Sequence, residues 1–187
     1  MKTRKTISTI VAAALAATIL GCSNELADGA PVELVVTNTQ TLQRIDLNGG
    51  EGCDENIGTI NMEVIPKNAE ADGSFNQVRV NRYRVSYQRT DGGTLVPRPF
   101  VRSIDTLIAV GGSAGLEEIV LFEQDVLFNA PFPALLPNNG GRDPEKGRPV
   151  VEMDVIVEVF GQTLGGDRVF DATRFQLDFC FLCDGCD

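Results

Sequence analysis

Four cysteines carry the most distinctive reactive chemistry in this sequence. Cys180, Cys183 and Cys186 follow one another at short, equal intervals near the C-terminus, and Cys53 stands alone far upstream. Thiols in such a pattern can form disulfides, hold a tetrathiolate zinc ion or an iron–sulfur cluster, or act as a redox Cys-x-x-Cys pair. Which of these applies depends on the compartment in which the chain folds.

Histidine, the usual base at neutral pH, is absent from the sequence. Without it, Ser-His-Asp catalysis, Cys-His catalysis and histidine-ligated zinc are excluded. Carboxylates or the two tyrosines, Tyr83 and Tyr87, could still support a reaction, but no spacing of such residues points to one. The sequence therefore predicts a protein that is not an enzyme, with no cofactor and no resident metal.

Four arginines gather in one segment of a chain that is otherwise acidic: Arg79, Arg82, Arg84 and Arg89. Clustered guanidinium groups could bind a carboxylate, a phosphate or an acidic polysaccharide, and Arg79, Arg82 and Arg84 are the candidate anion-binding residues. The other interpretation is a solvated strand face whose arginines pair with Asp and Glu across a sheet. We favour this second interpretation.

The N-terminal segment has the three parts of an export signal. It opens with three cationic residues, Lys2, Arg4 and Lys5. The uncharged run Thr6–Leu20 follows, and its 15 residues are fewer than the roughly 20 that span a bilayer comfortably. The run ends in Ile19-Leu20-Gly21-Cys22, which resembles the lipobox of bacterial lipoproteins. The resemblance implies cleavage after Gly21 and lipidation of Cys22 by acyl chains such as palmitate.

The same resemblance implies an address. Ser23 stands where an aspartate would imply retention at the inner membrane, so we expect an outer-membrane lipoprotein, periplasm-facing or surface-exposed. Residues 1–21 are then the signal peptide, residues 22–31 a short polar tether, and residues 32–187 a single folded domain.

The mature chain is strongly acidic. The signal holds three of the 16 basic residues and none of the 26 acidic ones, so residues 22–187 carry a net charge of −13. Such a domain repels phosphate backbones, which argues against nucleic acid as a partner. We expect the lipid to be its only attachment to the membrane.

An oxidising compartment favours disulfides among the four cysteines that remain beside Cys22. We expect two bridges, one from Cys53 to the C-terminal cluster and one within that cluster, although all three pairings are open. A bridge from Cys53 closes a loop of about 130 residues, which the chain-entropy model values at roughly 4–5 kcal/mol. A thiolate metal site and a redox pair are the two other interpretations.

Apolar and polar residues alternate along most of the domain, which is typical of half-buried strands. The clearest pair covers 151–159 and 174–181 and forms a hairpin through Gly165-Gly166-Asp167. Within 77–89 the apolar parity slips at Asn81-Arg82, and this slip predicts a β-bulge. Further strands are expected at 32–37, 60–66, 95–101, 104–110 and 116–128, the last with a helical turn as an option.

Seven or eight such strands, without a long helix, predict an all-β fold. An antiparallel two-sheet β-sandwich resembling the immunoglobulin fold in its pattern is the first choice, and a small β-barrel the second. Residues 130–149 hold five of the nine prolines and form a long loop. Apolar residues in or beside this loop either cover an open end of the sandwich or dock a partner; they are Phe128, Phe132, Leu135 and Leu136.

Together these features predict a lipid-anchored cell-envelope lipoprotein with a non-enzymatic structural or protein-interaction role and an envelope protein as candidate partner. A second hypothesis is a ligand-binding module for a glycan or calcium, which would use the end loops and the arginine strand. The acidic turns at Asp91-Gly92-Gly93 and Asp184–Asp187 lack the full ligand spacing of an EF-hand. A third hypothesis is a thiol-based metal or redox protein.

The mass of the exported protein before and after reduction distinguishes the three thiol chemistries. Two disulfides make the unreduced protein lighter than the reduced protein by about 4 Da, because each bridge replaces two thiol hydrogens. Equal masses, or a metal adduct in native mass spectrometry, would contradict the disulfide interpretation.

Overall fold

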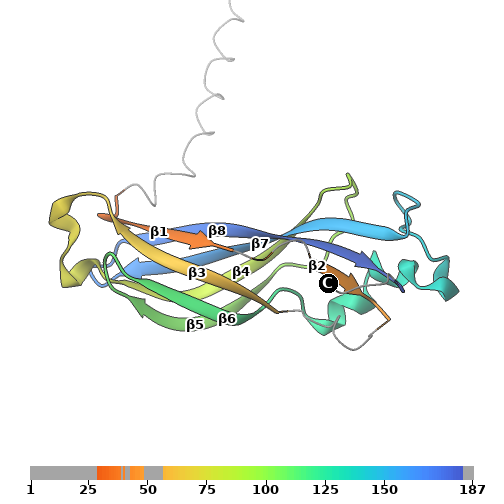
Figure 1. The fold of residues 1–187 in the computed structure, drawn as a ribbon, viewed down its shortest axis with the longest axis horizontal. Coiled ribbons are helices and arrows are strands. Elements are labelled where there is room, and N and C mark those ends of the chain that lie inside the picture. The colour runs from red at the N-terminus through yellow and green to blue at the C-terminus, as the bar shows by residue number, and fades with distance from the viewer. Residues whose placement is uncertain (1–28, 39, 41–42, 49–56, 183–187) are drawn as a thin grey trace, which may run out of the picture.

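The structure, a computed structural model, describes residues 29–38, 40, 43–48 and 57–182. Within these residues the chain forms eight β-strands and five short 3-10 helices (Figure 1). None of the described helices has the length and apolar character that a bilayer-spanning helix needs. Cys22 and the residues before it lie outside this part of the chain.

Two sheets pack against each other, as predicted for a β-sandwich. The smaller sheet has the order β1-β3-β6, with bounds β1 (Val32–Thr37), β3 (Ile57–Pro66) and β6 (Ser113–Val120). The larger has the order β2-β8-β7-β4-β5, with bounds β2 (Gln43–Asp46), β8 (Arg168–Cys180), β7 (Val150–Thr163), β4 (Val78–Arg89) and β5 (Phe100–Ile108). The larger sheet curls like half a barrel but does not close.

The strand order resembles that of an immunoglobulin-like sandwich, with no strand in the place of D among the described residues. Strands β1, β3 and β6 take the places of A, B and E, and strands β8, β7, β4 and β5 take those of G, F, C and C′. The chain of strand A continues onto the second sheet as β2, which pairs in parallel with β8. Every other neighbouring pair is antiparallel, so the predicted antiparallel sandwich is confirmed with this one exception.

The β7–β8 hairpin confirms the clearest alternation in the sequence. Its 13 paired positions run from Val150 opposite Cys180 to Gln162 opposite Arg168. Val155, Val157 and Val159 are fully buried and face the smaller sheet, while the residues between them face outward. This long hairpin forms the centre of the larger sheet because each β-branched side chain fills the space between the two layers.

The bulge predicted in β4 is also present. Pairing with β7 shifts between Val80 and Arg82, so Asn81 is an extra residue relative to β7. Pairing with β5 shifts at the same place, but there the additional residue lies on β5. The bulge lets Val80 and Tyr83 both face the core although their spacing is odd. Gly161 on β7 makes room for it, because a Cβ atom there would lie 2.9 Å from the carbonyl oxygen of Arg79.

Two predicted boundaries were wrong. The sequence suggested strands at 95–101 and 104–110, but the structure has one strand, β5, at Phe100–Ile108. Pro97 and Pro99 explain the difference, because proline has no N–H to give to a ladder. The expected strand at 116–128 ends with β6 at Val120, and a 3-10 helix, η3 (Gln124–Phe128), follows.

The long loop before β7 is an integral part of the core. Phe132 and Leu135, in the 3-10 helix η4 (Phe132–Leu135), are buried, and the Phe132 ring lies 4.5 Å from the Phe179 ring between centroids. Phe128 is 82% exposed, and Leu136 is half-buried. The loop covers the end of the sandwich opposite to the one where β1 begins (Figure 1). Of the two roles considered for its apolar residues, covering an open end is therefore the one that Phe132 and Leu135 have.

Truncation of the two loop phenylalanines tests this role of the loop. Phe132→Ala should lower the free energy of unfolding by about 3–5 kcal/mol, because it leaves a cavity against Phe179. Phe128→Ala is the matched control in the same loop and should change stability by about 0.5 kcal/mol or less. Urea unfolding followed by circular dichroism measures both; equal effects would show that the loop does not extend the core.

Candidate functional site

The three candidate anion-binding arginines lie on the outer face of the larger sheet. Arg79 precedes the bulge, and Arg82 and Arg84 follow it, so the extra residue keeps all three on the same side. Arg89 has the opposite parity and turns inward. The bulge places Arg79 on the same face as Arg82 and Arg84, whereas Arg89, an odd number of residues beyond Arg84, faces the core.

Two of the three outer arginines are paired with carboxylates across the sheet. Arg79 Nη2 lies 2.7 Å from Asp105 Oδ2 on β5, and Arg84 Nε lies 2.5 Å from Glu158 Oε2 on β7. The hydrogen bond within the first pair raises the pKa of Arg79 and lowers that of Asp105. This is the cross-strand pairing that we favoured, and an external anion would have to compete with these carboxylates.

Arg82 has a different neighbour. Its guanidinium carbon lies 5.0 Å from the centroid of the Phe160 ring, a cation–π distance. Phe160 in turn stacks on Phe170, with 6.2 Å between centroids and 25° between planes. Because Arg82 pairs with Phe160 and Phe160 with Phe170, the three side chains form a cross-strand ladder over β4, β7 and β8. We call it the Arg82–Phe160–Phe170 ladder.

Sequence reasoning missed the two phenylalanines of this ladder, although a signal was present. In β7 the outward positions include the polar residues Glu152, Asp154 and Glu158, and Phe160 shares their parity. A large apolar residue at a solvent-facing position of a strand marks an exposed patch. What the sequence could not supply was the register that places Phe160 beside both Arg82 and Phe170.

The two outer faces of the sandwich differ in charge. No lysine or arginine occurs in β1, β3 or β6, whose exposed acidic residues include Glu33, Glu63 and Glu117. The larger sheet adds two exposed arginines on β8, Arg168 and Arg174, to the three on β4. Basic side chains are thus concentrated on one face of an acidic protein.

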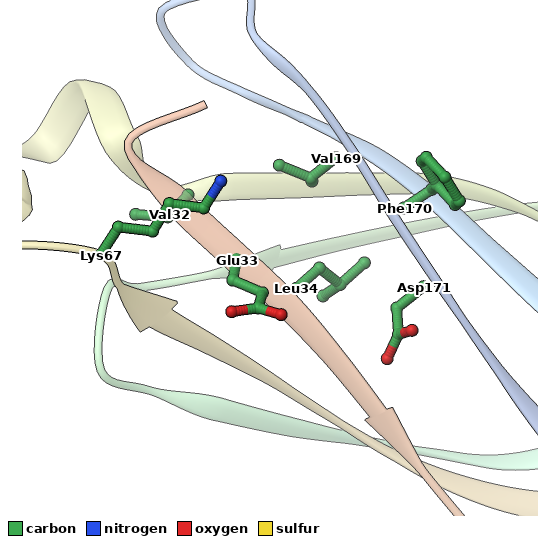
Figure 2. Close-up of a pocket in the computed structure, with 7 residues that line it drawn as sticks. All are labelled: Val32, Glu33, Leu34, Lys67, Val169, Phe170 and Asp171. Carbon is green, nitrogen blue, oxygen red and sulfur yellow. The ribbon is translucent and has the colours of Figure 1, made fainter. Parts of the chain in front are cut away.

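A pocket of about 270 Å³ lies at the seam between the two sheets, where β1 runs beside β8 (Figure 2). Each strand contributes three residues, and Lys67 closes one end. The backbone N–H of Val36 donates to Asp171 Oδ2 at 2.7 Å, and Asn38 Nδ2 donates to the carbonyl oxygen of Arg174 at 2.6 Å. The lining residues are Val32, Glu33, Leu34, Lys67, Val169, Phe170 and Asp171.

A buried ion network joins the two loops at the far end of the sandwich. The side chain of Arg89 is fully buried, with Nη2 2.5 Å from Asp91 Oδ2 and 2.9 Å from Asp143 Oδ2, both carboxylates also being buried. Gly93 permits this packing, because a Cβ atom there would lie 2.4 Å from the Arg89 guanidinium carbon. The network ties the segment after β4 to the segment before β7.

This network fixes the charge states of its members. Burial works against the charged guanidinium of Arg89, but its hydrogen bonds to Asp91 and Asp143 raise its pKa above the ordinary value. The hydrogen bond from Arg89 lowers the pKa of Asp91 to about 2 and also lowers that of Asp143. A calcium ion at the Asp91-Gly92-Gly93 turn would therefore have to displace a buried cation.

Among the cysteines of the candidate site, the structure describes Cys180. It ends β8, is buried, and is disulfide-bonded. The pairing of the four cysteines stays a prediction, because Cys53, Cys183 and Cys186 lie outside the described residues. Within the described part of the chain, no three Cys, Asp or Glu side chains gather as a metal site would require.

Comparison with protein-family models and with curated proteins finds no match to this sequence.

Removal of the Arg89 guanidinium tests the buried network. Arg89→Met leaves the buried carboxylates of Asp91 and Asp143 without their cation and should cost about 3–5 kcal/mol of folding free energy. Arg79→Met removes an arginine from an exposed pair and, as the control, should cost about 1 kcal/mol or less.

The pH dependence of stability in the wild type and in Arg89→Met tests the network by the direction of the change. In the wild type the lowered pKa values of Asp91 and Asp143 contribute stability above pH 4, which is lost as the pH falls from about 4 towards 2. In Arg89→Met the buried carboxyl groups should have raised pKa values, so stability should increase as the pH falls from 7 towards 4. Urea midpoints across this range measure both slopes; equal slopes would contradict the network.

Proposed function

We propose that this protein is a lipid-anchored lipoprotein of the bacterial cell envelope that binds a partner protein and does not catalyse a reaction. The observation that carries the proposal is the Arg82–Phe160–Phe170 ladder. Phe170 is 44% exposed, although a solvent-facing position of a sheet usually holds a polar residue. Arginine and aromatic side chains are the residues in which interfaces concentrate their binding energy.

The ladder is part of a wider apolar and basic surface. Val101 and Leu107 on β5 are 57% and 56% exposed, and they lie opposite Arg84 and Arg79 in the register. We define the arginine–phenylalanine face as these residues with the ladder: Arg79, Arg82, Arg84, Val101, Leu107, Phe160 and Phe170. Arg79 and Arg84 are already paired with Asp105 and Glu158, so the aromatic and aliphatic groups around Arg82 suit a partner that brings apolar side chains and an acidic side chain for Arg82.

The N-terminal motif supports the envelope address. Lipidation of Cys22 would hold the domain by several acyl chains, each methylene contributing about 0.8 kcal/mol when buried in the bilayer. A domain fixed in this way meets partners in the same compartment, and the arginine–phenylalanine face is available to them because it lies on the outside of the sandwich.

Photo-crosslinking in intact cells tests the proposal. A photoreactive residue at Val101 of the full-length chain should give a discrete protein adduct, whereas the same residue at Asn61, on the acidic outer face, should give none. Arg82→Glu in the Val101 chain should remove most of the adduct, because it reverses a charge at the centre of the face. Cys22→Ala should release the protein from the membrane fraction and reduce the adduct as well.

Three results would contradict the proposal: no adduct from Val101, the same adduct from both positions, or membrane retention of Cys22→Ala. A glycan ligand, the second hypothesis, would also use the stacked rings of Phe160 and Phe170. It would give no protein adduct from Val101, and oligosaccharides would shift the thermal unfolding of the wild type but not that of Arg82→Glu.

A further inference from the structure

The larger sheet has a partly open edge at the seam. β8 is 13 residues long, but β2 pairs with Leu177–Cys180 alone. No described strand pairs with the same edge of β8 between Arg168 and Gln176. β1 pairs with β3 and belongs to the other sheet, and it runs beside this stretch too closely for a further strand between them, so a strand added to β8 has to displace β1 from it.

Hydrogen bonds at both ends of β8 show which backbone groups face the open side. The carbonyl oxygen of Asp167 accepts from Thr163 N–H on the β7 side. The carbonyl oxygens of Arg174 and Cys180 accept on the other side, from Asn38 and Leu47. Since N–H and C=O of one residue point the same way and alternate along a strand, Arg168, Phe170 and Ala172 also direct theirs into the seam.

β1 presents a second open edge to the same seam. The carbonyl oxygen of Pro31, the residue before β1, accepts a hydrogen bond from Lys67 N–H on the β3 side. Val36 N–H, by contrast, donates across the seam to the side chain of Asp171. By the same alternation, Val32 and Leu34 direct their N–H and C=O groups towards β8. The pocket in Figure 2 thus lies between two strand edges, with apolar side chains of Val32, Leu34 and Val169 in its wall.

We propose that the seam receives an extended segment of the partner protein, which adds to the larger sheet as a strand alongside β8 at Arg168–Ala172. The inference rests on the proposed function, because the partner is the same and the added strand is the manner of its binding. Strand addition to an open edge gives affinity through main-chain hydrogen bonds and specificity through alternate side chains.

The outward row of β8 specifies one face of the added strand. Phe170 would have a cross-strand neighbour on its free side, which extends the Arg82–Phe160–Phe170 ladder to a fourth strand. An apolar or aromatic residue suits that position. Arg168 lies two residues away on the same row and favours an acidic residue at the adjacent position, whereas Arg174, four residues away, is already paired with Asp154.

The pocket specifies the other face of the added strand. Residues that alternate with those of the outward row would point to Val32, Leu34 and Val169, and small aliphatic side chains suit this wall. The occupant is therefore an acidic and apolar extended segment of another protein. Its acidic side chains complement Arg168, whereas a second copy of residues 22–187 would bring a net charge of −13 as a whole.

Amide hydrogen exchange of the full-length protein in detergent micelles, resolved by residue, tests the inference with defined peptides. The probe is an extended peptide with alternating faces. Glutamates flank a phenylalanine on the face that continues the outward row of β8, and valines occupy the face that meets the pocket wall. One control peptide carries prolines in place of two valines, and another carries lysines in place of the glutamates. The probe should slow exchange at Phe170 and Ala172 by about tenfold or more, since these N–H groups gain strand partners. Val169 and Asp171, whose N–H groups face β7, should not change.

Two variants locate the effect. Ala172→Pro removes an N–H that faces the seam and leaves the β7 ladder intact, so peptide protection should be lost; Ala172→Ser is the matched control and should keep it. Phe170→Ser leaves every backbone group in place but removes the ring, and it should weaken peptide binding at least about fivefold. This second variant keeps the test decisive should Ala172→Pro fail to fold.

Four outcomes would overturn the inference. Without peptide, the amides of Phe170 and Ala172 exchange as slowly as that of Asp171, or with peptide the protection falls on β5. The proline control peptide protects as well as the probe, or the lysine control peptide binds more tightly than the probe. Protection that rises with protein concentration alone would assign the seam to a second copy and overturn the assigned occupant. A Val101 adduct in cells without peptide protection would leave the proposed function standing and remove strand addition alone.

Discussion

The bulge at Asn81 is the constraint on which both the core and the outer surface depend. β4 pairs with β5 on one side and with β7 on the other, so a change of parity within it affects three strands at once. One extra residue allows Val80 and Tyr83 to face inward while Arg79 and Arg82 both stay outside. The bulge requires a glycine at position 161 of β7, because any side chain there would collide with the backbone of β4. Core packing and the arginine face thus have one common cause.

Local alternation predicted most of the fold because each strand has one buried and one solvated face. It identified the β7–β8 hairpin, the strand at Val32–Thr37, the slip in β4 and the two-sheet class. It did not predict β2, whose four residues are fixed by parallel pairing with β8 at the far end of the chain. It also left open the role of Phe132, since a loop residue becomes part of a core only through contacts with distant strands such as β8.

The candidate site divides in the same way. That Arg79 and Arg84 would pair with acids on adjacent strands followed from composition and parity, but Asp105 and Glu158 became identifiable only with the register. The inward turn of Arg89 follows from its odd spacing to Arg82 and Arg84, yet Asp91 and Asp143, which pair with it, come from separate loops. Phe160 and Phe170 were visible as apolar residues at polar positions, and only the pairing of β7 with β8 makes them one surface.

The position of the seam relative to the N-terminus adds a geometric argument. Val32, the first residue of β1, lines the seam pocket, so the chain enters the domain beside the proposed binding edge. The opposite end is covered by η3 and η4 and by the Arg89 network. If Cys22 carries the lipid, a segment bound at the seam lies within a few residues of the tether. Such a segment would be recognised close to the membrane surface, which favours a partner that is itself anchored there over one that diffuses freely.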